Sequence, residues 1–265
     1  MISPASHLLT SAKWLVYTTL GFFTYHFAQR KKIVIVLSSM RSGSTLLKSL
    51  MGQAQDVSLL DEFHFIPYAN HNKYFFYHLV SRLSDKPIVV LKKPFNNVSV
   101  HLPLYGKTPL ADVLNIVLCR HPYETLLSLK AMQRKKNYPV FSDEECVKYW
   151  CDTYEAIFDN IDTNRDTLFV QYEKLTSHPA EETRRIFEFI GSTQQGGVNG
   201  YREYAWKPGL DDDSDKVRSG TIHKAEAASP EIDSGLYTAI NNSPRIEMLL
   251  VKISQAISNQ RRSTQ

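Results

Sequence analysis

The feature that most constrains the fold of this 265-residue chain is one continuous stretch, residues 33–47, whose character changes twice. Residues 33–37 are β-branched or leucine, which is typical of a buried strand, and residues 38–44 are mostly serine and glycine, which is typical of a tight turn. Backbone N–H groups of such a turn, with the first unpaired N–H groups of the helix that follows, point toward one spot and favour an anion. The sequence therefore predicts an anion-binding loop between a strand and a helix.

The loop carries its positive charge in an unusual place. Loops of nucleotide triphosphatases end in Gly-Lys-Ser/Thr, whereas this loop reads Arg41, Ser42, Gly43, Ser44, Thr45 and contains no lysine. We therefore expect a phosphate-like ligand that is held by backbone N–H groups and by an arginine.

Strand-like runs alternate with helical patterns along the rest of the chain. This alternation predicts an α/β fold: one P-loop-like, doubly wound, mostly parallel sheet flanked by helices on both faces. The expected strands are residues 33–37, 57–60, 88–91, 115–119 and 168–170, and the expected helices are residues 45–53, 72–83, 123–134, 143–158, 177–190, 230–240 and 244–257. After the helix expected at 177–190, residues 192–231 read as a long loop, and the last two helices follow it.

The N-terminus allows three interpretations. Residues 8–28 are rich in apolar side chains, but the uninterrupted part, residues 14–27, is shorter than the roughly 20 residues needed to span a bilayer. A helix packed on the domain or lying in a membrane interface, a membrane anchor and a cleaved signal all remain open. We divide the chain into a hydrophobic N-terminal helix (1–30), one main domain (31–258) and a polar tail (259–265) that we expect to be frayed.

Composition excludes some classes of function. The net charge of +4, from 31 basic and 27 acidic residues, is too small to indicate nucleic-acid binding, although it suits an anionic small ligand. The three cysteines, Cys119, Cys146 and Cys151, have neither the spacing of a disulfide framework nor that of metal ligands. We expect a reducing compartment and no metal.

Charged groups follow three of the expected strands. Arg41 lies in the loop after residue 37, Lys92 and Lys93 precede Pro94, and Arg120 is followed by His121. Ligands of doubly wound sheets bind outside the carboxyl ends of strands, so this convergence favours an enzyme with an anionic ligand. Taken singly, the lysines also fit a solvated strand end, stopped by the proline, and Arg120 also fits a surface ion pair.

Two of these elements resemble a known family, the sulfotransferases that use 3′-phosphoadenosine 5′-phosphosulfate (PAPS). Residues 38–45 are similar to that family's loop for the 5′-phosphosulfate, in the arginine-containing form of carbohydrate and tyrosylprotein sulfotransferases. Arg120, with Ser128 eight residues later, resembles its 3′-phosphate element. The likeness extends over about residues 33–191 and includes residues 171–175 and 184–191. It implies PAPS as the sulfonate donor and no metal.

Beyond residue 191 the resemblance weakens. Arg218, Ser219 and Gly220 are the candidates for the family's late phosphate-binding loop, which they match poorly. The resemblance assigns them to the donor site together with the first loop, Arg120 and Ser128.

The resemblance also implies a catalytic base. Residues 61–65 resemble the catalytic-glutamate loop of Golgi carbohydrate sulfotransferases, which assigns the base to Glu62. Neighbouring aromatic side chains would raise the pKa of this carboxyl above its reference value near 4.3 and make it a stronger base. His64 is the alternative base. Lys92 is similar to the family lysine that contacts the transferring group, and Arg41 would balance charge on the oxygen that leaves.

The leading interpretation is a sulfotransferase that moves sulfonate from PAPS to a hydroxyl of a carbohydrate, lipid-linked or small-molecule acceptor. Two alternatives remain open: a P-loop-type kinase, which the missing lysine disfavours, and a non-catalytic membrane-associated nucleotide-binding protein. We expect a glycan or lipid partner, contact with a membrane surface and no nucleic-acid partner. The expected location is cytoplasmic or at a membrane, with a Golgi-type anchor still open.

Overall fold

The computed structural model describes residues 15–16, 19–20, 22–23, 31–60, 82, 84–95, 113–161, 166–201 and 221–262. In this part of the chain, five parallel strands form one sheet in the order β2-β3-β1-β4-β5. The strands are β1 (Lys32–Ser39), β2 (Val57–Leu60), β3 (Ile88–Phe95), β4 (Val113–Cys119) and β5 (Thr167–Gln171). The helices are α2 (Ser44–Met51), α4 (Pro122–Lys135), α5 (Asp143–Asn160), α6 (Tyr172–Ser177), α7 (Pro179–Ile190), η2 (Pro230–Asp233), α9 (Ser234–Asn241) and α10 (Pro244–Arg262).

The order of the strands places a switch point beside β1. The chain builds β2 and β3 on one side of β1 and then crosses to build β4 and β5 on the other side. In doubly wound sheets the ligand crevice lies at such a point, outside the carboxyl ends of the strands. The loop that leaves β1 is therefore the central element of that crevice.

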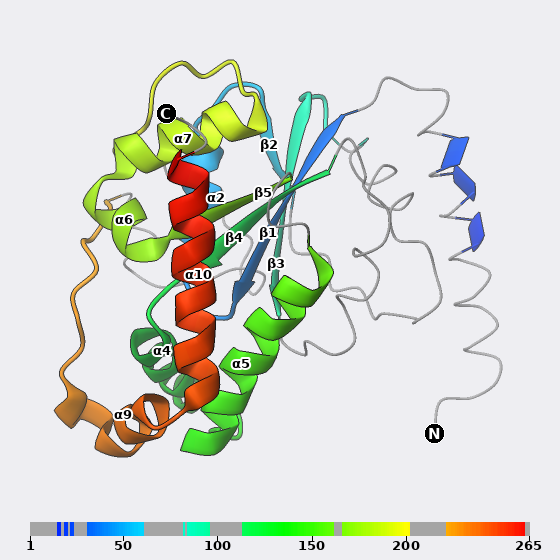
Figure 1. Ribbon diagram of the computed structural model, residues 1–265. Helices are drawn as coiled ribbons and strands as arrows, with labels where there is room; N and C mark the ends of the chain where they lie inside the picture. The colour runs from blue at the N-terminus through cyan, green and yellow to red at the C-terminus, as the bar shows by residue number, and fades with distance from the viewer. Residues whose placement is uncertain are drawn as a thin grey trace.

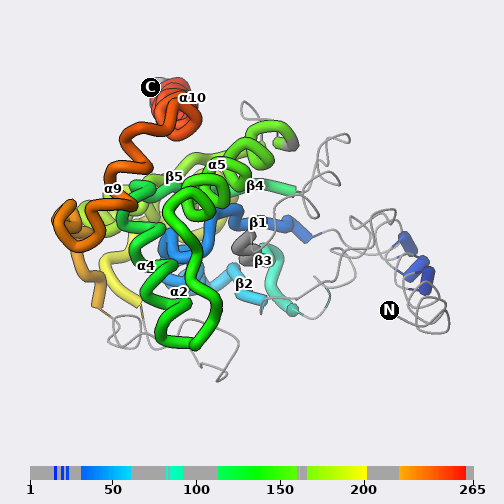
Figure 2. The backbone as a smooth tube through the Cα atoms, turned by 90° about the horizontal axis from the view of Figure 1, so that it is seen from below, coloured from blue at the N-terminus to red at the C-terminus, as the bar shows by residue number. Residues whose placement is uncertain are grey.

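Helices cover both faces of the sheet, as the alternating sequence pattern predicted (Figure 1). Ile33, Ile35 and Leu37 of β1 belong to a core built with α4, α5, α9 and α10. Val34 and Val36 belong to a second core, built with α2, α6 and α7. Successive residues of a strand face opposite sides, so a strand that is buried on both faces is apolar throughout. Figure 2 shows α9 and α10 beside α5.

A buried lysine joins three elements of the first face. Lys130 of α4 is only 7% exposed, and its ammonium lies 2.5 Å from Asp143 of α5 and 2.8 Å from Asp233 of η2. These contacts outweigh the effect of burial and raise the pKa of Lys130, while the same ammonium helps to lower the pKa of Asp233. Because a buried charge is tolerated only when it is paired, this lysine fixes where α9 begins relative to α4 and α5.

Residues that favour the beginning or end of a helix lie at several helix ends. Pro122 is the first residue of α4, and Ser142 caps α5 in a capping box with Glu145. Gly191 ends α7 in the left-handed conformation, with φ 64°. Ser177, which we expected to begin that helix, is instead the last residue of α6, and its hydroxyl donates back to the carbonyl of Glu173.

The expected end of β3 at residue 91 was wrong. The strand continues to Phe95, and Lys92 and Pro94 pair with Val36 and Ser38 of β1. Among the described residues, β2 ends at Leu60, in register with Leu91, and β3 pairs only with β1 beyond that residue. A proline is tolerated where one side of a strand has no strand neighbour.

The expectation of a frayed tail was also wrong for residues 259–262, while residues 263–265 lie outside the described part of the chain. Helix α10 runs to Arg262, and Gln260 lies against the outer edge of β5. Its side-chain oxygen accepts from the Phe169 N–H at 2.9 Å, and its side-chain nitrogen donates to the Thr167 carbonyl at 2.7 Å. One amide side chain thus takes the place of a neighbouring strand and covers an edge that would otherwise be exposed.

Little of the hydrophobic N-terminus falls within the described residues, where Leu15, Val16, Leu20, Phe22 and Phe23 are exposed. Among the helices in the described ranges, none has the length and apolar composition needed to cross a bilayer. The expected helix at 72–83 lies outside the described residues, as does most of the loop expected at 192–231.

The basic residues that follow the hydrophobic N-terminus contact the domain. The ammonium of Lys32 donates to the Ile190 carbonyl at 2.6 Å, and that of Lys31 donates to the Ser84 carbonyl. Lys32 thereby supplies a positive charge at the carboxyl end of α7, where the helix dipole favours one. These two lysines join the start of β1 to the rest of the domain.

We predict that replacing Gln260 with alanine lowers the free energy of unfolding by about 1–3 kcal/mol, because two backbone groups of β5 lose their partner. Urea unfolding monitored by circular dichroism measures this loss. The matched control is Gln255→Ala on the exposed side of the same helix, which should change stability by less than about 0.5 kcal/mol. Equal effects of the two substitutions would contradict the role of Gln260.

Candidate active site

The loop after β1 turns sharply at Arg41 and Gly43. Both residues have positive φ angles, 67° and 93° respectively. Gly43 occupies the N-cap position of α2, and no side chain accepts a cap hydrogen bond there. The start of α2 therefore has the geometry expected of an anion-binding loop.

Gly43 is required by contact as well as by conformation. A Cβ atom at this position would lie 2.3 Å from Cδ2 and from Cε2 of Tyr172, the first residue of α6. The aromatic ring thus packs directly against the loop backbone. Only glycine combines this close approach with the left-handed conformation.

Tyr172 also contacts the arginine that follows β4. The guanidinium carbon of Arg120 lies 4.6 Å from the centroid of the Tyr172 ring, within the range of a cation–π interaction. One ring therefore lies between the first loop and the end of β4. Residues 171–175 entered the sequence argument only as a region of resemblance, but Tyr172 follows the end of a strand, so the argument from converging strand ends could have identified it.

Arg41 and Arg120 hold each other in place. One terminal nitrogen of Arg120 donates to the carbonyl oxygen of Arg41 at 3.2 Å, and Nε of Arg41 donates to the hydroxyl of Ser128 at 3.2 Å. A left-handed conformation at a residue other than glycine costs on the order of 1–2 kcal/mol, so such contacts are needed to maintain it. The loop that the resemblance assigns to the 5′-phosphosulfate therefore lies beside Arg120 and Ser128, which it assigns to the 3′-phosphate.

The serines of the loop differ in what they do. The Ser42 hydroxyl is buried and donates to the carbonyl of Ser39 at 2.7 Å, which closes the turn. Ser44 and Thr45 lie in the first turn of α2 and are also buried. Ser42 thus stabilises the shape of the loop through its side chain.

Arg120 has an unused donor. Its Nε is buried and has no hydrogen-bond partner among the described residues. No salt bridge to a carboxylate is formed by Arg120 within the described ranges either, which argues against the alternative of a surface ion pair. An orphaned buried guanidinium nitrogen beside a glycine turn fits an anionic group such as a phosphate.

Two carboxylates flank the site, and both contact His121. Its backbone N–H donates to Glu173 at 2.9 Å, and its ring Nδ1 lies 2.5 Å from Glu124. The hydrogen bond to Glu124 raises the pKa of His121 despite partial burial. Burial by itself would raise the pKa of Glu124, but the hydrogen bonds from His121 and from backbone N–H groups outweigh it and lower this pKa. Both carboxylates thus have His121 as a partner.

Other candidate residues cannot be placed. Glu62 and His64 lie outside the described residues, and so do Arg218, Ser219 and Gly220. The backbone of Lys92 lies within β3, opposite Val36, whereas its side chain is outside what the structure describes. Since β2 ends at Leu60 beside Leu91, the chain leaves β2 next to Lys92 and reaches Glu62 two residues later.

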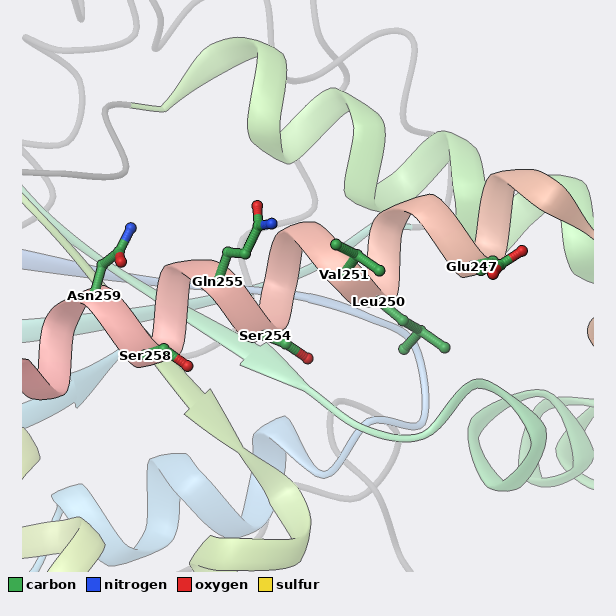
Figure 3. Close-up of a pocket in the computed structure, with 7 residues that line it drawn as sticks. All are labelled: Glu247, Leu250, Val251, Ser254, Gln255, Ser258 and Asn259. Atoms are coloured by element: carbon green, nitrogen blue, oxygen red, sulfur yellow. The ribbon is translucent and has the colours of Figure 1, made fainter.

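The described residues contain no group of histidine, cysteine or carboxylate side chains suited to hold a metal ion. One surface hollow lies along α10, and Figure 3 shows that all its lining residues come from that single helix. They are Glu247, Leu250, Val251, Ser254, Gln255, Ser258 and Asn259. This set contains no cation and no residue from a strand end, so the hollow is separate from the candidate active site.

Comparison with known proteins supports a relation to one family. Residues 68–195 match the profile of the sulfotransferase family, a range that includes Arg120 and Ser128 and begins after the first loop. No curated protein matches the sequence of this chain. The matched range spans just under half of the chain, and it agrees with the resemblance to sulfotransferases found in the sequence.

Solved structures show the same fold at low sequence identity. One is the sulfotransferase domain from the curacin biosynthetic pathway, with 17% identity and a TM-score of 0.51; the match covers 86% of this chain and 99% of that chain. Another is mouse sulfotransferase SULT7A1 complexed with PAP, with 16% identity and a TM-score of 0.50; the match covers 87% of this chain and 92% of that chain. The doubly wound α/β fold expected from the sequence is confirmed.

We predict that Gly43→Ala destabilises the protein by more than about 1 kcal/mol, because the added Cβ meets Tyr172 and the residue must keep a left-handed conformation. Urea unfolding measures the change. Gly196→Ala is the matched control, since a Cβ at Gly196 meets nothing within 4 Å, and it should alter stability by less than about 0.5 kcal/mol. If Gly43→Ala is as stable as the control, the close packing on Tyr172 is not significant.

Proposed function

We propose that this sulfotransferase uses PAPS as its donor and transfers the sulfonate to a hydroxyl of an acceptor. The observation that carries the proposal is the contact between Arg41, Arg120 and Ser128 at the switch point of the sheet. Two cations and a glycine turn in one place suit a ligand with two anionic ends. PAPS is such a ligand, with a 5′-phosphosulfate and a 3′-phosphate, and the mouse neighbour was crystallised with PAP.

Each group of residues then has a defined task. The loop from Arg41 to Thr45 would hold the 5′ end through backbone N–H groups and the dipole of α2. Arg120 would use its buried, unpartnered Nε for the 3′-phosphate, with Ser128 beside it. Bound PAPS supplies the sulfonate. Arg41 and Lys92 would stabilise negative charge on the phosphate oxygen as its bond to sulfur breaks.

The acceptor oxygen must lose a proton as it forms its bond to sulfur. We assign this proton to the Glu62 carboxylate, which follows the end of β2 by two residues, with His64 as the alternative base. The position in the chain supports this assignment, because β2 ends beside the backbone of Leu91, next to Lys92. Positioning and electrostatic stabilisation would supply most of the rate.

The acceptor belongs to a broad class: a carbohydrate, a lipid-linked molecule or a small molecule that bears a hydroxyl. The exposed apolar side chains of Leu15, Val16, Leu20, Phe22 and Phe23 favour an acceptor found at a membrane surface. A kinase remains the second candidate function, but the absence of a lysine at the end of the loop disfavours it.

Ligand-induced stabilisation distinguishes the two functions. We expect 3′-phosphoadenosine 5′-phosphate, at about 100 times its Kd, to raise Tm by roughly 5–10 °C, because it binds only the folded state. Differential scanning fluorimetry measures this shift. ATP with Mg²⁺ is the matched comparison and should give a smaller one. A larger shift with ATP and Mg²⁺ would reverse the assignment in favour of the kinase.

The catalytic assignment is tested separately. We predict that Glu62→Gln lowers the rate of labelled sulfonate transfer by about 10²–10⁴-fold, because a neutral amide cannot accept the acceptor's proton. Its affinity for 3′-phosphoadenosine 5′-phosphate, measured by calorimetry, should stay within about twofold of wild type, since the substitution leaves the donor loop unchanged.

Asp61→Asn is the matched control, because it neutralises the adjacent carboxylate and should retain most activity. If Glu62→Gln lost donor affinity and turnover to the same degree, Glu62 would not be acting as the base.

A further inference from the structure

A side chain of α5 forms a hydrogen bond to the backbone of the loop after β1, residues 40–43, which we call the donor loop. The N–H of Met40 donates to the hydroxyl of Tyr149 at 2.8 Å, across 109 residues of sequence. Tyr149 is only 9% exposed and belongs to the same core as Ile35 and Leu37 of β1. The side chain of Met40 packs against that core as well. The loop is therefore attached to α5 through both its backbone and its side chain.

This hydrogen bond acts on the most constrained residue of the loop. Arg41 has a φ of 67°, and the chain around it is held on both sides. Before Arg41, the Met40 N–H is held by Tyr149; at Arg41 itself, the carbonyl is held by Arg120. A residue with a side chain rarely adopts this conformation without support. The two hydrogen bonds, to Tyr149 and from Arg120, therefore fix the position of the Arg41 backbone from which its side chain extends.

Tyr149 is itself firmly placed. Its ring lies 6.1 Å from that of Phe141, centroid to centroid, and Phe141 directly precedes Ser142, the N-cap residue of α5. Burial raises the pKa of Tyr149 to about 12, so the hydroxyl stays neutral over the working range of pH. A neutral hydroxyl can accept from an amide without adding negative charge beside a site that is meant to bind anions.

We propose that Tyr149 is a positioning residue for sulfonate transfer: by accepting from the Met40 N–H, it keeps Arg41 in the left-handed conformation from which its guanidinium reaches the donor. The effect on the donor rests on the proposed function, whereas the effect on loop conformation does not. Tyr149 contacts none of the reacting atoms and acts only through the loop.

Tyr149→Phe is the informative substitution because it keeps the buried ring and removes the acceptor. Met40 then has a partly buried N–H without its partner, or the loop rearranges to give it another. Gln260→Ala is the matched control: it also removes hydrogen bonds to the backbone, but at Thr167 and Phe169 of the edge strand β5, so it controls for a general loss of stability.

Two measurements test the proposal. Hydrogen exchange of the ligand-free proteins should be faster in residues 38–47 of Tyr149→Phe than in wild type or in Gln260→Ala. Calorimetry should give a Kd for 3′-phosphoadenosine 5′-phosphate about tenfold higher for Tyr149→Phe, with Gln260→Ala close to wild type. Unchanged exchange and affinity in Tyr149→Phe would overturn the proposal, and so would an equal change in both variants.

The outcomes separate this inference from the proposed function. If wild type fails to bind 3′-phosphoadenosine 5′-phosphate, the proposed donor is wrong, and the exchange rates still decide whether Tyr149 holds the loop. If Tyr149→Phe does not fold, amide exchange of Met40 in wild type, followed by nuclear magnetic resonance, decides it instead. A protected Met40 amide supports the inference, and one that exchanges as fast as a solvent-exposed amide overturns it.

Discussion

The hydrogen bond from Arg120 to the carbonyl of Arg41 is the contact on which the candidate site depends, because it joins the ends of the two central strands. It can form since β1 and β4 are parallel neighbours in register, with Leu37 opposite Val117, so both strands end at the same edge of the sheet. The same guanidinium lies over Tyr172 after β5. Three strand ends are thus connected through one side chain.

Burial on both faces makes this arrangement stable. The residues of β1 from Ile33 to Leu37 are at most 1% exposed, so the strand cannot shift along its neighbours without removing apolar side chains from two cores. A fixed strand end allows the loop after it to adopt an unfavourable backbone conformation. The loop is held from three directions, by Arg120 of the β4 end, by Ser128 of α4 and by Tyr149 of α5.

Sequence reasoning succeeded where the signal was local. The five strands and the helices expected at 123–134 and 143–158 depend on residues within one strand or a few turns of helix, and the structure has an element at each of these places. It failed where a distant partner decided the outcome. Pro94 continues β3 by pairing with Ser38 of β1, beyond the described pairing with β2. Residues 259–262 stay helical in α10, whose Gln260 pairs with β5. Neither partner can be recognised from the neighbouring sequence.

The sequence by itself determined the parallel α/β fold, the glycine turn after the first strand and the arginines that follow two strands, because strand burial and turn conformation depend on near neighbours. Only the tertiary structure decided which groups those arginines contact. The carbonyl of Arg41 accepts a hydrogen bond from Arg120, 79 residues away, and Nε of Arg41 donates to the hydroxyl of Ser128, 87 residues away. The N–H of Met40 donates to the hydroxyl of Tyr149, 109 residues away. Contacts at such separations follow from the order and register of the strands, and these are settled when two hydrophobic cores pack against one sheet.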